Sequence, residues 1–256
     1  MSLALRIQAR VLAAQSAIVA HDSDNATAGS PAVAPLPVDR AVATAAAQIG
    51  ARLRHDLQRL KEIRSIALKI AAKREMLPEY AAWVAGLLSG AQAAGAGVSG
   101  DVLPTVMVWN IDVGDYAAAM PLIEHVLAHK VAMPTRYARD AATLVVEEIA
   151  EAAIKAQAAD QPFDLAILEQ IEALTAEDDM HDEVRAKLLK AIGFELDRTA
   201  QTASGAGADA TPLFVRSLTT MKAAQALHDR VGVKTTIKAV EKRLAAAKPD
   251  PAGSTG

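Results

Sequence analysis

Lysine and arginine are concentrated in one stretch of this chain, from Arg40 to Glu75. The stretch holds nine Lys/Arg against three Asp/Glu, a net charge of +6, whereas the rest of the chain holds 18 against 27, a net charge of −9. Ammonium and guanidinium groups gathered on one segment bind phosphates and release the counterions condensed on a polyanion. The charge asymmetry therefore indicates one part of the protein that meets a polyanion and another that does not.

The same stretch has a second interpretation, in which its charges only keep one flank of a coiled coil solvated. Arg59 lies three residues from both Asp56 and Glu62, and opposite charges three or four residues apart pair on a helix. Such exposed pairs contribute little to stability and need no ligand. The charges alone leave both interpretations open.

The basic stretch lies within residues 39–77, whose pattern predicts one long helix that a following proline interrupts. Apolar residues recur there every three or four positions, close to the 3.5-residue period of a coiled coil. Arg52 and Arg59 lie seven residues apart on one flank of this seam. Arg54 and Lys61 do the same on the other flank. We expect copies of the chain to associate through the seam, which consists of Ile49, Leu53, Leu57, Leu60, Ile63 and Ile70.

The composition favours an all-α fold. Apolar residues make up 52% of the 256 residues but aromatic residues only 3%, and alanine accounts for the excess. The absence of cysteine excludes disulfides and thiolate metal sites. No apolar run reaches the ~18 residues of a membrane span, and Arg6, Gln8 and Arg10 interrupt the apolar N-terminal residues, so neither a span nor a signal peptide is expected. The cytosol is the expected compartment.

Changes in composition divide the chain into six segments. Proline at three positions between residues 31 and 37 forbids a helix there, and glycine is frequent between residues 90 and 100. A short apolar helix is expected from Tyr80 to Leu88. The expected segments are an amphipathic helix (1–20), a Pro/Ala-rich linker (21–38), a basic helical region (39–89), a flexible linker (90–100), a helical-hairpin domain (101–248) and a disordered tail (249–256).

Short helices in pairs are predicted after residue 100. Gly114 can take the left-handed conformation that ends a helix, and Asp115 can cap the next one. Two hairpins, near 101–130 and near 182–229, look like tetratricopeptide-type units. The predicted helices span residues 101–112, 115–130, 136–159, 164–175, 182–198, 211–229 and 233–247.

Two further clusters could bind a metal, although simpler interpretations are favoured. His125 and His129 share one face of a predicted helix, but no third ligand is visible at a useful spacing. The acidic run 177–183 could hold the divalent ions of a nuclease, but acids at a helix start more often complement the helix dipole. No phosphate-binding GxxxxGK[ST] loop is present. We therefore predict no catalytic residue, no metal site and no cofactor.

Three stretches carry a resemblance to a known family. They are residues 71–78 (AAKREMLP), 105–115 (TVMVWNIDVGD) and 180–190 (MHDEVRAKLLK). In this order they resemble the small terminase subunits of temperate contractile-tailed phages, whose members are often labelled endonuclease subunits. The resemblance runs from about Leu57 to Leu244.

The resemblance implies a role in packaging viral DNA in the host cytoplasm. Small terminase subunits assemble into rings, recognise viral double-stranded DNA, and recruit and regulate the large terminase subunit, which carries the ATPase and the nuclease. The implied partners are thus viral DNA, the large subunit and further copies of this chain, with no membrane.

In such a ring the basic helix would form a continuous positive surface. The residues expected to contact DNA are Arg52, Arg54, Arg59, Lys61, Arg64, Lys69, Lys73 and Arg74. Two alternatives remain open. One is a coiled-coil scaffold of helical repeats with no DNA role, and the other is a metal-dependent endonuclease that uses Asp178 and Asp179.

Overall fold

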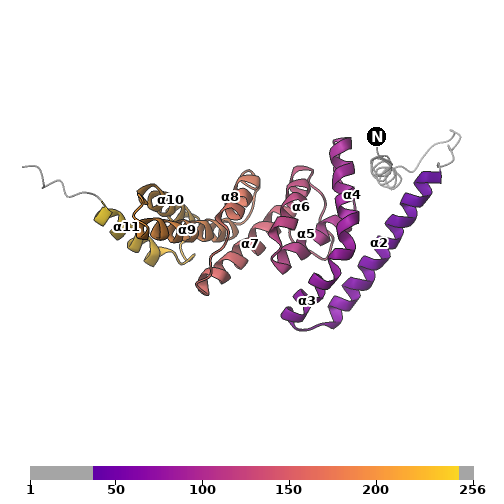
Figure 1. Ribbon diagram of the computed structural model, residues 1–256, viewed down its shortest axis with the longest axis horizontal. Helices are drawn as coiled ribbons and strands as arrows, with labels where there is room; N and C mark the ends of the chain where they lie inside the picture. Colours follow the sequence, from indigo (N-terminus) through magenta and orange to yellow (C-terminus); the bar gives the residue numbers. More distant parts are fainter. Residues whose placement is uncertain (1–36, 248–256) are drawn as a thin grey trace, which may run out of the picture. The chain divides into compact units, whose positions relative to one another are not determined.

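The computed structural model describes residues 37–247, which form ten α-helices and no strand (Figure 1). The predicted all-α class is confirmed. The described helices belong to two compact units that divide between Ala141 and Ala142. No helix within the described range combines the length and apolarity that crossing a bilayer requires. The amphipathic helix predicted for residues 1–20, nearly all of the linker and the tail lie outside the described residues.

The first unit contains five helices: α2 (Pro37–Glu62), α3 (Ile66–Met76), α4 (Pro78–Ala94), α5 (Val102–Val113) and α6 (Tyr116–Ala128). The prediction of one continuous helix over residues 39–77 is wrong, because residues 63–65 turn the chain between α2 and α3. Ser65 is extended there, and its hydroxyl accepts a hydrogen bond from the Leu68 amide at the start of α3. A serine side chain that satisfies a free helical N–H stabilises such a break.

Helix α4 is longer than the segment Tyr80–Leu88 that we expected. It continues through Gly90 and Ala91, both buried, and ends at Gly95 with φ +62°. Small residues in this last part allow close packing, which outweighs the low helix propensity of glycine.

Tyr80 anchors α2 to the rest of the first unit. Its ring is buried and stands edge-on to the ring of Trp109 in α5, with centroids 5.7 Å apart. Its hydroxyl donates a 2.7 Å hydrogen bond to the buried carboxylate of Asp56 in α2. Burial, assisted by this bond, raises the pKa of Tyr80 well above its usual value. Beside this anchor Leu53 and Leu60 are buried within the same chain.

The turn between α5 and α6 follows the prediction. Gly114 ends α5 with φ +78°, and the Asp115 carboxylate accepts a hydrogen bond from the Ala118 amide in the first turn of α6. The two helices therefore pack as a hairpin.

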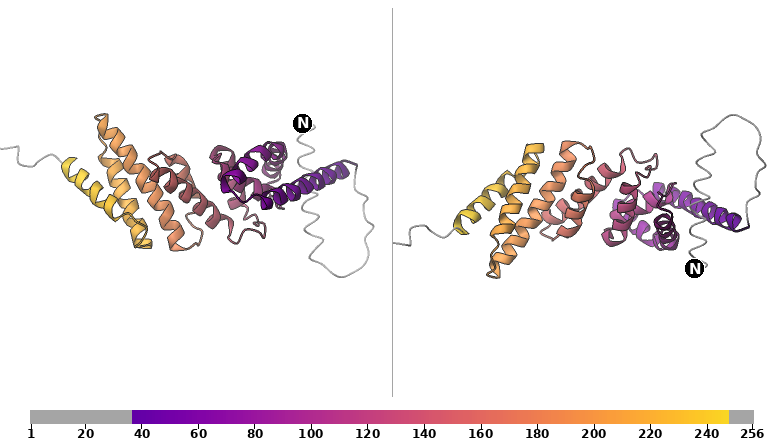
Figure 2. Two further views of the ribbon diagram at one scale, coloured as in Figure 1. Left: turned by 90° about the horizontal axis from the view of Figure 1, so that it is seen from below. Right: turned by 90° about the horizontal axis from the view of Figure 1, so that it is seen from above.

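The second unit contains α7 (Ala141–Ala158), α8 (Leu165–Leu174), α9 (Asp182–Gly205), α10 (Thr211–Leu227) and α11 (Lys234–Ala247). Helix α10 lies between α9 and α11, as both views of Figure 2 show. The α9–α10 crossing is close at Gly193, whose carbonyl accepts a 2.8 Å hydrogen bond from the Ser217 hydroxyl. Helix α7 starts five residues later than predicted and α9 ends seven residues later, while the other predicted helices of this unit agree within two residues.

Candidate nucleic-acid interface

One flank of α2 is neutralised by carboxylates of the same unit. Arg52 pairs with Glu79 of α4 at 2.9 Å, and Arg59 pairs with Glu75 of α3 through two bonds of 2.8 and 3.3 Å. The bonds to Arg59 lower the pKa of Glu75, and those to Glu75 raise the pKa of Arg59. These partners lie across the turn, not within α2. We call Arg52 and Arg59 the paired flank.

Two other residues that were predicted to contact DNA, Lys73 and Arg74, contact the end of α5 instead. The Lys73 ammonium lies 2.5 Å from the Asp112 carboxylate, and both side chains are largely buried. Arg74 donates a hydrogen bond of 3.1 Å to the carbonyl oxygen of Val113. Both cations therefore fasten α3 to α5 within the unit.

The remaining four predicted cations have no ion-pair partner among residues 37–247. Arg54 and Lys61 lie exposed on the flank of α2 opposite the paired flank, and Arg64 and Lys69 lie at the turn into α3. Arg40, which we did not include among the predicted contacts, is exposed and likewise without an ion pair within this range. Arg40 lies 14 residues before Arg54, which is about four helical turns, so the two residues share one face of the helix. This spacing in the sequence could have identified Arg40 as a further candidate contact.

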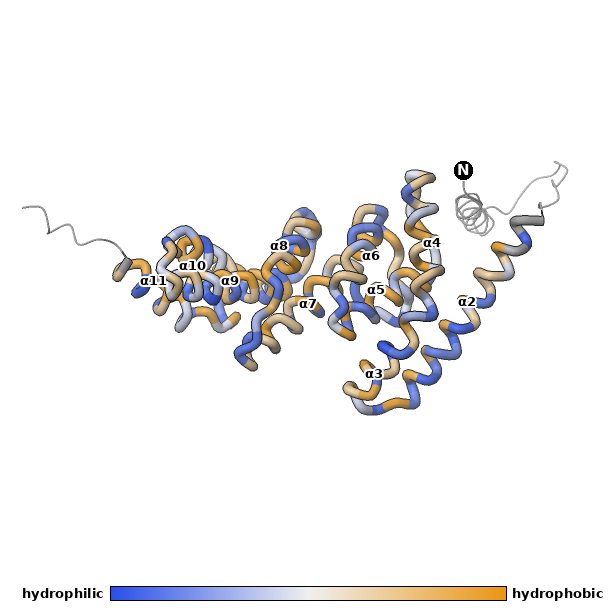
Figure 3. The backbone as a smooth tube through the Cα atoms, viewed as in Figure 1, coloured by the Kyte–Doolittle hydropathy of each residue, from blue (hydrophilic) through white to orange (hydrophobic). Residues whose placement is uncertain are grey.

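Arg40, Arg54 and Lys61 form what we call the free row. Spacings of 14 and seven residues keep them on one face of α2, over about 32 Å of helix at 1.5 Å per residue. Figure 3 shows hydrophilic and hydrophobic residues alternating along α2. Unpaired cations gain more from a phosphate than cations that already hold a carboxylate, because no existing bond must break. The free row is thus the set of α2 cations that hold no carboxylate among residues 37–247.

The predicted apolar seam is divided between two environments. Leu53 and Leu60 contribute to the core of the first unit. The other four seam residues are only partly buried by their own chain, namely Ile49, Leu57, Ile63 and Ile70.

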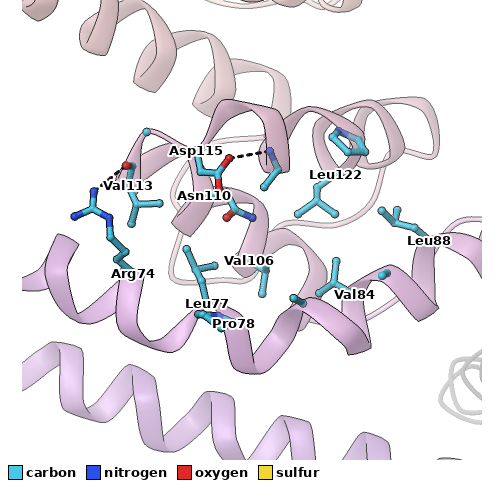
Figure 4. A pocket seen from close by; sticks show the side chains of 15 residues that line it. Arg74, Leu77, Pro78, Val84, Leu88, Val106, Asn110, Val113, Asp115 and Leu122 are labelled. Atoms are coloured by element: carbon cyan, nitrogen blue, oxygen red, sulfur yellow. Dashed lines mark hydrogen bonds between the residues drawn. The ribbon is translucent and has the colours of Figure 1, made fainter.

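A groove of about 700 Å³ runs between α4 and α6, with α5 as its floor. Figure 4 shows Leu77, Pro78 and Val84 on one side and Leu122 on the other. Two of the three stretches that carry the family resemblance, 71–78 and 105–115, meet here, at Arg74 and Val113 among others. The groove wall that α4 supplies is mainly apolar.

His125 and His129 lie together, with ring centroids 4.5 Å apart. The buried His125 Nε2 accepts a 3.1 Å hydrogen bond from the Val98 amide and so holds the loop after α4. Within residues 37–247 no group of three or more His, Asp or Glu residues is placed to hold a metal ion. The role that the structure gives the His125 ring is therefore to accept the hydrogen bond of the Val98 amide.

This hydrogen bond predicts a loss of stability in mild acid. Burial, and then the neighbouring His129, lowers the pKa of His125 below its usual 6.5. As pH falls below about 6.5 the unfolded chain takes up a proton that the folded chain refuses, so the free energy of unfolding falls, by at most about 1.4 kcal/mol per pH unit. Urea unfolding followed by tryptophan fluorescence at pH 7.5 and 5.5 measures this, since both tryptophans lie in the first unit.

The control for this pH prediction is His125→Leu, which removes the titrating ring. Its stability is lower throughout because the Val98 amide loses its acceptor, but the difference between the two pH values shrinks. A pH dependence that persists unchanged in this variant contradicts the assignment.

The acidic run 177–183 lies at the start of α9. Asp182 and Glu183 occupy its first turn, where negative charge complements the helix dipole. Glu183 lies 3.7 Å from Lys187 one turn on.

Comparison with known proteins adds two findings. Residues 50–183 match the family model described as phage small terminase subunit. The chain is 38% identical over 209 residues to a protein of Escherichia phage P2 named terminase, endonuclease subunit, covering 82% of this chain and 78% of that protein. No solved structure matches the chain.

Proposed function

Because this chain belongs to the phage small terminase subunit family and so acts in packaging phage DNA, we propose that it binds viral duplex DNA through the free row. In this proposal it also recruits and regulates a large terminase subunit in the host cytoplasm. Binding is non-covalent: the side chains of Arg40, Arg54 and Lys61 replace counterions that are condensed on the DNA phosphates.

The observation that carries the proposal is that cations without a carboxylate partner among residues 37–247 are aligned along α2. The row covers about 32 Å, close to one turn of duplex DNA. Assembly of several copies into a ring would repeat the row and multiply the number of phosphate contacts. Three cations per copy then give an affinity that no single copy provides.

The second unit favours a protein partner over DNA. Its residues 142–247 hold 12 Lys/Arg and 17 Asp/Glu, a net charge of −5. An excess of negative charge repels duplex DNA within about a Debye length of 10 Å. Paired helices such as α9 and α10, which we propose to act as tetratricopeptide-like hairpins, present extended faces that suit a protein ligand. We assign the recruitment of the large subunit to this unit.

Duplex binding at several salt concentrations tests the proposal. We expect a labelled 30-base-pair duplex to bind, with the logarithm of the association constant falling linearly as the logarithm of salt rises between 50 and 200 mM. Native mass measured in parallel reports the assembly. An affinity that does not respond to salt, or no binding at 50 mM, would favour a scaffold without a DNA role.

A further inference from the structure

A recess of about 380 Å³ lies within the second unit, lined by α7, α9 and the loop that joins α10 to α11. On each helix the lining residues are three or four positions apart, which places them on a single face. Helix α9 contributes Lys187 and Lys190, α7 contributes Lys155, and the loop contributes Arg230. Cations from three separate segments therefore line one recess, although residues 142–247 carry a net charge of −5.

The carboxylates of the recess already have a cationic partner. Lys187 lies 3.1 Å from Glu151 of α7 and 3.7 Å from Glu183 one turn earlier on α9. The acid next to the arginine of the loop, Asp229, pairs outside the recess with Lys234 at 2.8 Å. The cations of the recess that have no ion-pair partner among residues 37–247 are Lys155, Lys190 and Arg230.

The Lys190 ammonium is the most enclosed of these three cations. Lys190 is partly buried, whereas Lys155 and Arg230 are exposed. Its Nζ donates a 2.9 Å hydrogen bond to the Val231 carbonyl oxygen and lies 5.5 Å from the centre of the Phe194 ring. Burial lowers the pKa of Lys190, since no carboxylate replaces the water that the ammonium has lost. An ammonium has three N–H donors, so donors remain for an anion in the recess.

We propose that this recess receives an acidic segment of the protein partner that the second unit recruits. The inference rests on the recruitment in the proposed function and names its chemistry, which is two neighbouring carboxylates beside an aliphatic side chain. With His228 neutral, the recess holds four cations and two carboxylates, so two further negative charges balance it. The apolar part of the lining suits the aliphatic side chain and consists of Ile154, Ala158 and Val231.

An acidic segment suits the recess better than duplex DNA does. A duplex carries one negative charge about every 1.7 Å, so its approach sets many charges against the 17 Asp/Glu of residues 142–247. A segment with two carboxylates brings only its own two charges. Phosphates are bound by cationic and polar groups, so a duplex would leave the apolar part of the lining unused.

Binding of the full chain to its cognate full-length large terminase subunit tests the proposal. The recess variant is Lys155→Glu with Arg230→Glu, since both side chains are exposed and neither pairs with a carboxylate among residues 37–247. The matched control, Lys238→Glu with Lys242→Glu, makes the same change of charge at exposed positions of α11. A conservative variant, Lys155→Arg with Arg230→Lys, keeps both charges in place. Circular dichroism and thermal unfolding are expected to match the parent chain in all three variants.

Titration calorimetry is expected to show binding at least about tenfold weaker for the recess variant. The control and the conservative variant are expected to change affinity by less than about threefold. An unchanged affinity in the recess variant, or an equal loss in the control, overturns the inference alone. A selective loss of duplex binding in the recess variant would assign the recess to DNA and also overturn it. A parent chain that does not bind the large subunit overturns recruitment in the proposed function as well.

Carbodiimide cross-linking of the complex reads the contact directly, because the reagent joins an amine to a neighbouring carboxylate through an amide bond. Mass spectrometry is expected to find Lys155 or Lys190 joined to an Asp or Glu of the large subunit. No such link is expected at Lys238 or Lys242. Links at these control lysines alone, or a complex in which neither recess lysine is linked, contradict the proposed contact.

Discussion

Replacing Arg54 and Lys61 together with alanine is expected to weaken duplex binding at least about tenfold at 50 mM salt, because several copies each lose two phosphate contacts. Each lost contact removes about 0.9 from the slope of the logarithm of affinity against the logarithm of salt, so the slope becomes shallower by about 1.8 for each bound copy. Native mass is expected to stay at the parent value. Anisotropy titrations between 50 and 200 mM salt measure both quantities.

The matched control is Arg52→Ala with Arg59→Ala on the paired flank. This variant loses the same formal charge from the same helix, so long-range attraction of DNA falls equally in both variants. Since Glu79 and Glu75 already occupy these two arginines, the control is expected to change affinity by less than about threefold and to leave the salt slope nearly unchanged. Equal losses in both variants would mean that the ion pairs open and that DNA contacts the paired flank.

The positions of the helices after residue 100 could largely be predicted from sequence. The turn at Gly114 and Asp115 shows why, since a glycine with positive φ and an aspartate cap act over four residues. The break at residues 63–65 could not be predicted in this way. No glycine or proline stands there, and the contacts that hold the folded-back helices come from distant residues, namely the buried Tyr80–Asp56 hydrogen bond and the Arg59–Glu75 pair.

In the candidate site, too, some features follow from the local sequence and others depend on residues far along the chain. The residue types of the cations could be predicted, but their partners lie far along the chain, as in the pair of Lys73 with Asp112. Which cations stay free depends on the fold. The apolar period correctly identifies the buried face of α2, but it does not say what covers that face. Leu53 is buried by its own chain, whereas a seam between copies would show the same period.

Gly193→Ala is expected to destabilise the second unit by about 1–3 kcal/mol, although alanine is the better helix former. A Cβ atom at this position would lie 2.5 Å from Met221 Cγ and 3.5 Å from the Ser217 carbonyl oxygen. Met221 is fully buried and cannot move into solvent. The added methyl group therefore forces α9 and α10 apart. Gly205→Ala at the end of the same helix, where no atom lies within 4 Å, is expected to be neutral or stabilising by less than about 1 kcal/mol.

The position of the tryptophans allows the two units to be followed separately. Trp83 and Trp109 both lie in the first unit, so we expect Gly193→Ala to lower the urea midpoint seen by circular dichroism and to leave the fluorescence midpoint unchanged. Met221→Ala alone creates a cavity and costs about 2–5 kcal/mol. In the double variant, Gly193→Ala with Met221→Ala, the methyl group added at position 193 enters the cavity left at position 221. The combined loss in free energy of unfolding is expected to be at least about 1 kcal/mol smaller than the sum of the two single losses. Additive losses would show that the α9–α10 approach at Gly193 does not limit the packing of the second unit.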